Sequence, residues 1–294
     1  MYIKYALYFL LFWKKSNFEA NMQDVKLVDI ENLIASKNPK ILKWTPRFVL
    51  RYLKKILHQD EVNDFISKNK DKKGADWCKA GVDFLEMTYS VKNIEKIPKE
   101  GKIVIAMNHP LGGMDAIVLI DALKDHRKDL KFIVNDLLMN IESMEDMFVG
   151  VDKYGKAKDS IRTQIKNLFQ SDNAVCIFPA GLVSRETKGE VKDLVWKKTF
   201  VTYSKDYERT IVPIYIEGKL SPFFYRLSRI RKFFGIKMNI EMLYLSNELF
   251  KQRGKHINFV VGDPIEKEYL FNEKNDRTLS ANIKNITYAL RNQL

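Results

Sequence analysis

After residue 89 the sequence alternates short β-branched runs with helical patterns, and this alternation constrains the fold more than any other feature. The runs are bounded by Gly, Pro and Asn, residues that end strands. The predicted strands are 103–107, 132–135, 174–178, 211–216 and 257–261, and the predicted helices include 114–125, 157–169 and 193–205. Strands that alternate with helices form a mostly parallel central sheet flanked by helices. The sequence therefore predicts an α/β fold.

The region before this alternation has a helical pattern. Asn38-Pro39 and Thr45-Pro46 provide helix breaks and starts within it. We expect an N-terminal helical region over 25–88 and an α/β domain over 89–294. The stretch 46–58 predicts a basic amphipathic helix, which either packs against a core or contacts a membrane. Its predicted apolar face consists of Val49, Tyr52, Leu53 and Ile56.

The first residues, 1–24, contain an apolar run over 5–13 that is closed by Lys14 and Lys15. The run is too short to span a bilayer and has no clear small-residue cleavage site. Three interpretations stay open: sequence upstream of a true start at Met22, an interfacial anchor, or a signal segment. Elsewhere the apolar runs are shorter than a spanning helix needs, so the body is not expected to cross a membrane.

The charge balance of the chain points to an anionic partner. The 294 residues are 46% hydrophobic, enough for a sizeable core, and 50 Lys and Arg against 37 Asp and Glu give a net charge of +13. Such an excess attracts nucleic acid, anionic lipid or an acidic carrier protein. The cations lie beside aromatics at helical spacing, and no nucleic-acid module is recognisable. We therefore expect an anionic membrane surface as a partner and no nucleic acid.

The cysteines and histidines are too few for a disulfide framework or a zinc site. The chain has two cysteines, Cys78 and Cys176, within a predicted helix and a predicted buried strand. Buried thiols in a reducing compartment are the expected state. The four histidines and two cysteines lack metal-ligand spacing. We predict neither a metal nor a cofactor.

The predicted strand 103–107 leads into Asn-His-Pro-Leu-Gly-Gly-Met-Asp, which ends at Asp115. Ligand chemistry in open α/β sheets lies beyond the carboxyl ends of strands. The glycines Gly112 and Gly113 favour a tight turn that brings Asp115 back toward the His109 imidazole. A carboxylate on Nδ1 fixes the tautomer and leaves Nε2 to accept a proton. We predict His109 and Asp115 as the catalytic pair; the alternative is a structural loop histidine.

This segment resembles the glycerolipid acyltransferase family, which has Asn-His, four further residues and Asp on a strand-to-helix turn. Five residues separate His109 from Asp115 here. This longer Pro-Leu-Gly-Gly form resembles a bacterial subgroup labelled hemolysin-like or lysophospholipid acyltransferase, and the resemblance extends over about 27–265. It implies an O-acyltransferase of membrane lipid synthesis. His109 would act as general base without a covalent enzyme intermediate, and N–H groups near Gly112 and Gly113 would stabilise the oxyanion.

A second segment, 177–185, reads Ile-Phe-Pro-Ala-Gly-Leu-Val-Ser-Arg and resembles the family block Phe-Pro-Glu-Gly-Thr-Arg-Ser. In the family this block helps hold the acceptor's phosphate and glycerol. Ala180 replaces the family's Glu and the Arg is shifted, which disfavours a glycerol-phosphate acceptor. An amino-acid lyso-lipid with its hydroxyl on a 3-hydroxy acyl chain is then permitted beside a lysophosphatidic acid. The resemblance implies substrate-binding roles for Phe178, Pro179, Gly181, Ser184 and Arg185; the alternative for Arg185 is a surface arginine.

Two weaker blocks also have counterparts. The run 148–153 stands where the family carries a phosphate-contacting Arg, so Lys153 is either a substrate-binding point charge or a solvated lysine. The run 212–215, Val-Pro-Ile-Tyr, is expected to line the acyl groove.

The segment 222–234 is dense in aromatics and cations, as an interfacial helix requires; the alternative is a core-packed helix. Its predicted stripe consists of Phe223, Leu227, Ile230 and Phe234, flanked by Arg226, Arg229 and Lys232. We expect a peripheral protein on the cytoplasmic face of the inner membrane, with acyl carrier protein or acyl-CoA as donor and a lyso-lipid as acceptor. The alternative is a basic, hemolysin-like protein that binds membrane or nucleic acid without acyl transfer.

Overall fold

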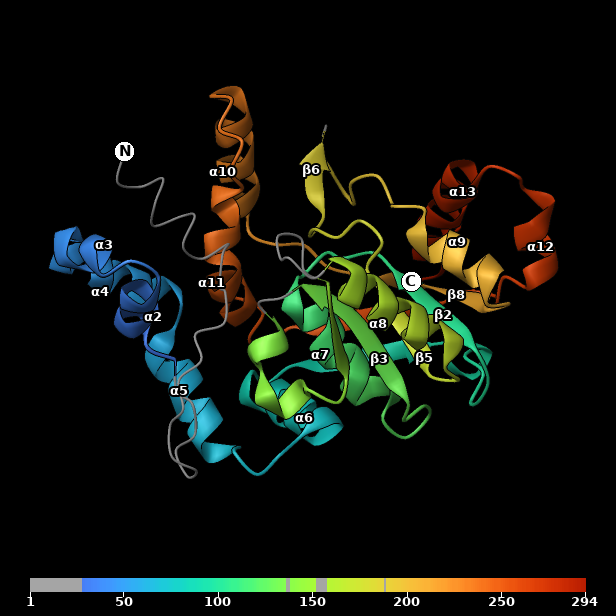
Figure 1. The fold of residues 1–294 in the computed structure, drawn as a ribbon, viewed down its shortest axis with the longest axis horizontal. Coiled ribbons are helices and arrows are strands. Elements are labelled where there is room, and N and C mark those ends of the chain that lie inside the picture. Colours follow the sequence, from blue (N-terminus) through green and yellow to red (C-terminus); the bar gives the residue numbers. More distant parts are fainter. Residues whose placement is uncertain (1–27, 136–137, 152–157, 188) are drawn as a thin grey trace. The chain divides into compact units, whose positions relative to one another are not determined.

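A computed structural model describes residues 28–135, 138–151, 158–187 and 189–294 (Figure 1). The segment 1–24 and Lys153 therefore lie outside the described residues. The chain divides into two compact units. One, the sheet unit, comprises residues 73–220 and 253–294; the other, the helical unit, comprises residues up to 72 and 221–252.

The sheet unit contains a seven-stranded sheet in the order β1-β9-β8-β2-β5-β3-β4. All neighbouring strands are parallel except β8 and β9, which confirms the predicted α/β fold. Its strands are β1 (Thr88–Lys92), β2 (Ile103–Met107), β3 (Leu130–Asn135), β4 (Phe148–Val151), β5 (Ala174–Ile177), β8 (Thr210–Ile216) and β9 (His256–Val261). A separate antiparallel hairpin consists of β6 (Arg185–Thr187) and β7 (Glu190–Lys192).

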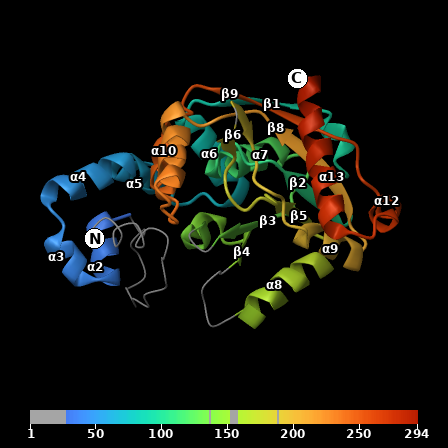
Figure 2. The same ribbon diagram turned by 90° about the horizontal axis from the view of Figure 1, so that it is seen from above.

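Helices cover both faces of this sheet, with α6 and α7 on one side and α8 and α9 on the other (Figure 2). The second face carries a core cluster in which strand residues such as Val104 and Val175 pack with Phe200 and Ile283 from the helices. The helices of the unit are α6 (Gly74–Phe84), α7 (Gly113–Leu123), α8 (Lys158–Gln170), α9 (Thr199–Asp206), α12 (Lys267–Asn272) and α13 (Asp276–Ala289). Single 3₁₀ turns occur at Ile94–Lys96, Leu138–Asn140, Glu142–Met144 and Leu290–Gln293.

Strand β2 lies in the middle of the sheet, and all five of its residues are buried. This is the burial expected of a parallel strand covered on both faces. In the register, Val104 lies opposite Ile211 of β8 and Val175 of β5. Because the three strands are parallel and in this register, the segments after β2, β5 and β8 leave the sheet at the same edge.

Two differences from the predicted elements concern this unit. The predicted helix over 193–205 is wrong at its start, because α9 begins at Thr199. The residues before it make tertiary contacts instead: the Lys197 N–H donates to Pro179 O, and Trp196 Nε1 donates to Asp193. Strand β1 was not predicted, because it is an edge strand with no buried residue.

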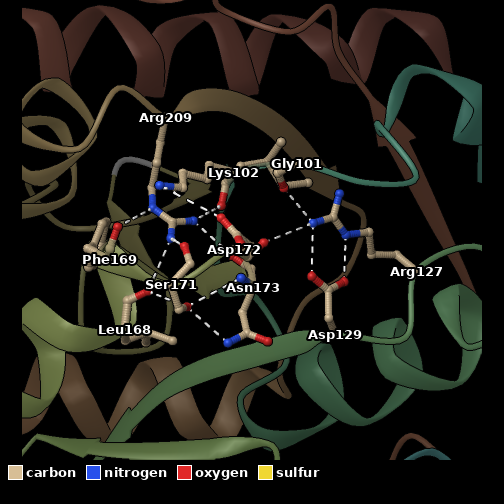
Figure 3. A network of polar contacts seen from close by, with 11 residues as sticks. Gly101, Lys102, Arg127, Asp129, Leu168, Phe169, Ser171, Asp172, Asn173 and Arg209 are labelled. Atoms are coloured by element: carbon tan, nitrogen blue, oxygen red, sulfur yellow. Dashed lines mark hydrogen bonds and ion pairs between the residues drawn. The ribbon is translucent and has the colours of Figure 1, made fainter.

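At the amino ends of the strands, two buried arginines are bonded to the backbone of the surrounding loops (Figure 3). Arg209 donates to the carbonyls of Phe169 (2.8 Å), Ile103 (3.0 Å), Asn173 (2.8 Å), Leu168 (3.1 Å) and Ser171. Arg127 binds Asp129 through Nε (2.6 Å) and Nη2 (2.9 Å), and it also donates to the Pro98 and Gly101 carbonyls. These contacts satisfy carbonyls at the end of α8 and around the starts of β2 and β5.

The helical unit is held together by a small apolar cluster formed by Ile30, Ile34, Leu50, Leu53 and Ile56. Tyr244, from the segment between β8 and β9, packs against this cluster. The unit's helices are α2 (Ile30–Lys37), α3 (Pro39–Trp44), α4 (Arg47–Ile56), α5 (Gln59–Lys68), α10 (Pro222–Phe233), the 3₁₀ helix Ile240–Tyr244 and α11 (Leu245–Phe250).

The predicted apolar face of α4 is only partly buried, and the predicted stripe of α10 is largely exposed. In α4 the buried residues are Leu50, Leu53 and Ile56, whereas Tyr52 of the predicted apolar face is 49% exposed. In α10 the buried positions are Phe224, Tyr225, Ser228 and Arg231. Three of the four predicted stripe residues are exposed: Phe223, Ile230 and Phe234. Among the described helices, none is long and apolar enough to span a bilayer.

The two units divide the chain differently from the sequence-based boundaries at 88 and 89. Helix α6 belongs to the sheet unit, where it packs on α7. Residues 221–252, which follow β8, belong to the helical unit. The helical unit is thus discontinuous in sequence, and no local pattern marks such an insertion.

Candidate active site

The site begins with Asn108, which joins the carboxyl ends of β2 and β8. Its side-chain Nδ2 donates to Ile216 O at 2.8 Å, and its Oδ1 accepts from Ile216 N at 2.7 Å. The side chain is therefore bonded as a backbone amide would be, and it is almost fully buried. This pair fixes where the chain leaves β2, immediately before His109.

His109 and Asp115 are in contact, as predicted. His109 Nδ1 lies 2.8 Å from Asp115 Oδ2, and the Leu111 N–H donates to Asp115 Oδ2 at 3.0 Å. The carboxyl is fully buried, whereas the imidazole is 18% exposed. Burial raises the pKa of the Asp115 carboxyl, opposed by the hydrogen bonds from His109 and Leu111. An ionised Asp115 accepts a hydrogen bond from Nδ1–H, so the proton stays on Nδ1 and Nε2 carries the lone pair.

The turn between these two residues depends on Gly112. Its φ is 74°, in the region that favours glycine, and it caps the start of α7. Asp115 lies in the first turn of that helix, where the unpaired N–H groups favour a negative charge. Its N–H also donates to Gly112 O at 3.0 Å. The extra residue relative to the family's spacing is thus accommodated at the Gly112-Gly113 turn.

The second predicted segment lies against the imidazole. The Phe178 ring stacks on the His109 ring with centroids 4.0 Å apart and an interplanar angle of 22°. A turn follows in which the Gly181 N–H donates to Phe178 O at 2.9 Å, and Gly181 has a φ of 66°. The contacts cover one face of the imidazole, and no hydrogen-bond partner for Nε2 occurs among the described residues. This is the arrangement that a general base requires.

Asp193 holds the His109 backbone and was missed by the sequence analysis. Its Oδ1 accepts from the His109 N–H (3.1 Å) and from Ser184 Oγ (2.6 Å), and its Oδ2 accepts from Trp196 Nε1 (2.8 Å). The Ser184 N–H in turn donates to His109 O at 2.8 Å. Both backbone groups of His109 are thus bound by residues that flank the β6–β7 hairpin. No local sequence signal marks Asp193, which is 84 positions from His109.

The predicted substrate-binding residues fall into two groups. Phe178 and Ser184 contact His109, Pro179 and Gly181 lie in the turn that begins at Phe178, and Gly112 and Gly113 lie in the turn between His109 and Asp115. Arg185 follows Ser184, but its side chain is buried, and its Nη1 donates to Val183 O at 2.7 Å. Arg185 therefore hydrogen-bonds to the backbone of the turn that precedes it. Because its side chain is buried, the alternative of a surface arginine is wrong. The substrate-binding roles of all these residues stay predictions.

The two cysteines are not suited to act as nucleophiles. Cys78 and Cys176 are buried, and burial raises the pKa of the Cys78 thiol to about 12 and that of Cys176 further. Neither is a thiolate near neutral pH. Within the described ranges, no group of three or more His, Cys, Asp or Glu residues could hold a metal ion.

Comparisons with known proteins show which chains this one is similar to. The chain is 42% identical to the lyso-glycine lipid O-acyltransferase of Bacteroides thetaiotaomicron over 265 residues, covering 90% of this chain and 97% of that protein. It is 41% identical to the protein of the same name from Phocaeicola vulgatus, covering 90% and 95%. The crystal structure of the 1-acyl-sn-glycerophosphate (LPA) acyltransferase of Thermotoga maritima matches with a TM-score of 0.46 and 15% identity, covering 100% of this chain and 98% of that chain.

A sequence model of the acyltransferase family matches residues 32–294, almost the whole chain. This match favours the enzymatic hypothesis over a basic binding protein without acyl transfer. With the match and the two relatives taken together, the chain belongs to the acyltransferase family.

Proposed function

We propose that the protein transfers a fatty acyl group from a thioester donor to the hydroxyl of a lyso-amino-acid lipid. The observation that carries this proposal is the His109–Asp115 pair at the carboxyl end of β2, within a chain of the acyltransferase family. A buried carboxylate fixes the imidazole, and the opposite ring nitrogen is left for chemistry.

In the proposed mechanism, His109 Nε2 takes the proton of the acceptor hydroxyl as its oxygen attacks the thioester carbonyl. The new C–O bond gives a tetrahedral oxyanion, for which the first N–H groups of α7, near Gly113, are suitable donors. The oxyanion then collapses, the C–S bond breaks, and the imidazolium returns its proton to the leaving thiolate, which departs as a thiol. Asp115 stabilises the imidazolium while it exists. No covalent enzyme intermediate forms.

The acceptor is proposed from the relatives and from position 180. Both relatives are named for O-acyl transfer to a lyso-glycine lipid. Glycine itself has no hydroxyl group, so an O-acylated glycine lipid needs a hydroxyl on its lipid chain, such as a 3-hydroxy acyl chain. Ala180 is buried and supplies no carboxylate to a glycerol headgroup. These observations favour an amino-acid lyso-lipid over lysophosphatidic acid.

Either acyl carrier protein or acyl-CoA fits as the donor, because both carry the acyl group as a thioester. Acyl carrier protein is acidic, and the chain's net charge of +13 favours its encounter with the enzyme.

We further propose peripheral binding to an anionic membrane, on the cytoplasmic face of the inner membrane, through the helical unit. Segments 39–56 and 222–237 contain eleven Lys and Arg and no Asp or Glu. Tyr52 Oη lies 2.9 Å from Tyr244 Oη, and the Phe223 ring packs edge-on against the same tyrosine. The exposed aromatic and aliphatic side chains of these segments are Trp44, Phe48, Tyr52, Phe223, Ile230, Phe233, Phe234 and Ile236. Rings beside cations are the composition of interfacial helices.

The acceptor proposal is tested with purified enzyme and a radiolabelled acyl thioester, supplied once on acyl carrier protein and once on CoA. An N-(3-hydroxyacyl)glycine and a lysophosphatidic acid serve as competing acceptors. We expect the label to appear in an ester of the glycine lipid. Label found only in phosphatidic acid would contradict the proposed acceptor, and label in neither product would contradict lyso-lipid acyl transfer.

The membrane proposal is tested by sedimentation with vesicles of neutral or partly anionic lipid. We expect binding to the anionic vesicles, weakened by salt and reduced about tenfold when Phe233 and Phe234 are both replaced by Ser. Phe271→Ser, at an exposed phenylalanine of the sheet unit, is the control and should bind normally. Equal binding of all three proteins would exclude this surface.

A further inference from the structure

One face of α13 binds the segment 190–196, which carries Asp193. The residues of this face are spaced four apart in the helix: Ser280, Lys284 and Tyr288. Ser280 Oγ donates to Trp196 O at 3.2 Å, and Lys284 Nζ donates to Leu194 O at 3.0 Å. Just after the helix, Arg291 binds Glu190 at 2.7 Å. The contacts run in opposite order along the two segments, so α13 holds the segment along its length.

Asp193 is the residue that this face holds most closely. Its backbone N–H donates to Tyr288 Oη at 2.7 Å, and its carbonyl accepts from Lys284 Nζ at 2.7 Å. The two peptide groups that flank its Cα are therefore both fixed by α13. The side chain between them carries the carboxylate that accepts from the His109 N–H at 3.1 Å. Two hydrogen bonds in series thus connect the Tyr288 hydroxyl with the His109 backbone.

The Tyr288 hydroxyl is suited to a fixed position. The side chain is buried, and its burial raises the pKa of the hydroxyl, which therefore stays neutral and accepts from the Asp193 N–H. Without the hydroxyl, this buried N–H would lose its acceptor, and the Asp193 backbone would have to shift to find another. Such a shift would move the carboxylate that holds His109.

We propose that Tyr288 is a positioning residue for acyl transfer, acting together with Lys284 through Asp193 on His109. This inference rests on the proposed function, in which His109 is the general base. The rate of proton removal depends on where Nε2 lies relative to the acceptor hydroxyl, and small displacements of a catalytic group are costly. The helix α13 thereby supports the chemistry of the site from outside it.

The first test compares Tyr288→Phe with Tyr89→Phe in transfer of an acyl group to an N-(3-hydroxyacyl)glycine. Tyr89 is the matched control, because its hydroxyl donates to the buried Asp121 at 3.0 Å, elsewhere in the same unit. We expect Tyr288→Phe to lower kcat about tenfold with little change in either KM, and Tyr89→Phe to keep the wild-type kcat. Equal kcat values in the two variants would overturn the inference.

Lys284→Met provides a second, independent variant. It removes the donor to the Asp193 carbonyl, and kcat should fall by about threefold or more. Its control is Lys205→Met, which removes a donor to the Glu273 carbonyl at 2.7 Å and should leave kcat unchanged. A wild-type kcat in Lys284→Met would remove this residue from the proposal.

A double-mutant cycle shows whether Tyr288 acts through Asp193. Residues that act independently have effects on kcat that multiply, whereas residues that act through one another do not. We expect the double variant Tyr288→Phe/Asp193→Asn to have a kcat within about twofold of that of Asp193→Asn alone. Effects that multiply would overturn the proposed route.

The position of His109 can also be followed without turnover. The chain has four histidines, so protein labelled with ¹⁵N-histidine gives four backbone amide signals, and the one missing in His109→Gln belongs to His109. Tyr288→Phe should shift this signal, and Tyr89→Phe should leave it in place. An unmoved signal in Tyr288→Phe would contradict the inference. If the wild type transfers no acyl group, the proposed function fails, whereas a shifted signal would still show that Tyr288 positions His109.

Discussion

The two ends of the central sheet both bury charged groups against the backbone, yet only one of them, the end that carries the proposed site, holds a partly exposed histidine. At the amino ends, the donors of Arg209 are directed at carbonyls of the end of α8, the start of β2 and the residue before β5 (Figure 3). At the carboxyl ends, Asp115 and Asp193 are equally buried, but they hold a third group, His109, which is partly exposed. A buried charge therefore does not by itself indicate a functional site, because it can have a purely structural role. A functional site also needs a group that is held in one orientation and remains partly accessible, as His109 is.

At the carboxyl end of the sheet, Asp115→Asn is expected to have the largest effect on catalysis. An amide in place of the carboxylate cannot stabilise the imidazolium and favours the wrong tautomer of His109. We expect kcat to fall about 10²- to 10⁴-fold, with the melting temperature little changed, in assays of the purified variant. A variant whose kcat stays within a few-fold of the wild-type value would show that Asp115 has only a structural role.

At the amino end, Arg209→Met should have the opposite signature. The substitution removes the donors to five backbone carbonyls at the end of α8 and the starts of β2 and β5, so we expect a loss of about 3 to 5 kcal/mol in the free energy of unfolding. Denaturant unfolding measures this loss, and activity per folded molecule should stay close to normal. A strong fall in kcat with unchanged stability would remove the distinction between the two ends.

Asp193→Asn lies between these extremes. The amide keeps the size of the side chain but can no longer accept from all of the His109 N–H, Ser184 Oγ and Trp196 Nε1. Because the His109 backbone loses part of its support, we expect kcat to fall about 10- to 100-fold. The KM for the donor should change little, which steady-state kinetics can resolve. If stability falls and kcat does not, Asp193 belongs with Arg209 as a structural residue.

The smallest effect is expected from the cysteines. Burial raises the pKa of both thiols, that of Cys78 to about 12, so neither ionises appreciably near neutral pH. After treatment of the native enzyme with an alkylating reagent, activity should stay within about twofold of that of the untreated enzyme. Mass spectrometry shows which thiols have been modified. Rapid inactivation that follows modification of Cys176 would point to a thiol in the reaction.

The elements that depend on local pattern were predictable from the sequence, and those that depend on long-range contacts were not. The buried run of β2 matched its predicted bounds, and the glycine turn correctly indicated the contact between His109 and Asp115. Asn108 binds Ile216 across 108 positions, and Asp193 binds His109 across 84. Neither contact has a local signature, and the predicted helix over 193–205 concealed the segment that carries Asp193 and Lys197.

His109 is proposed as the general base of acyl transfer, and His109→Ala tests this role most directly. The variant is compared with the wild type for transfer of a radiolabelled acyl group to an N-(3-hydroxyacyl)glycine, with melting temperature and circular dichroism as controls for folding. We predict a fall in rate of about 10³-fold or more in a protein that folds normally. A folded His109→Ala protein that transfers the acyl group at the wild-type rate would contradict the claim.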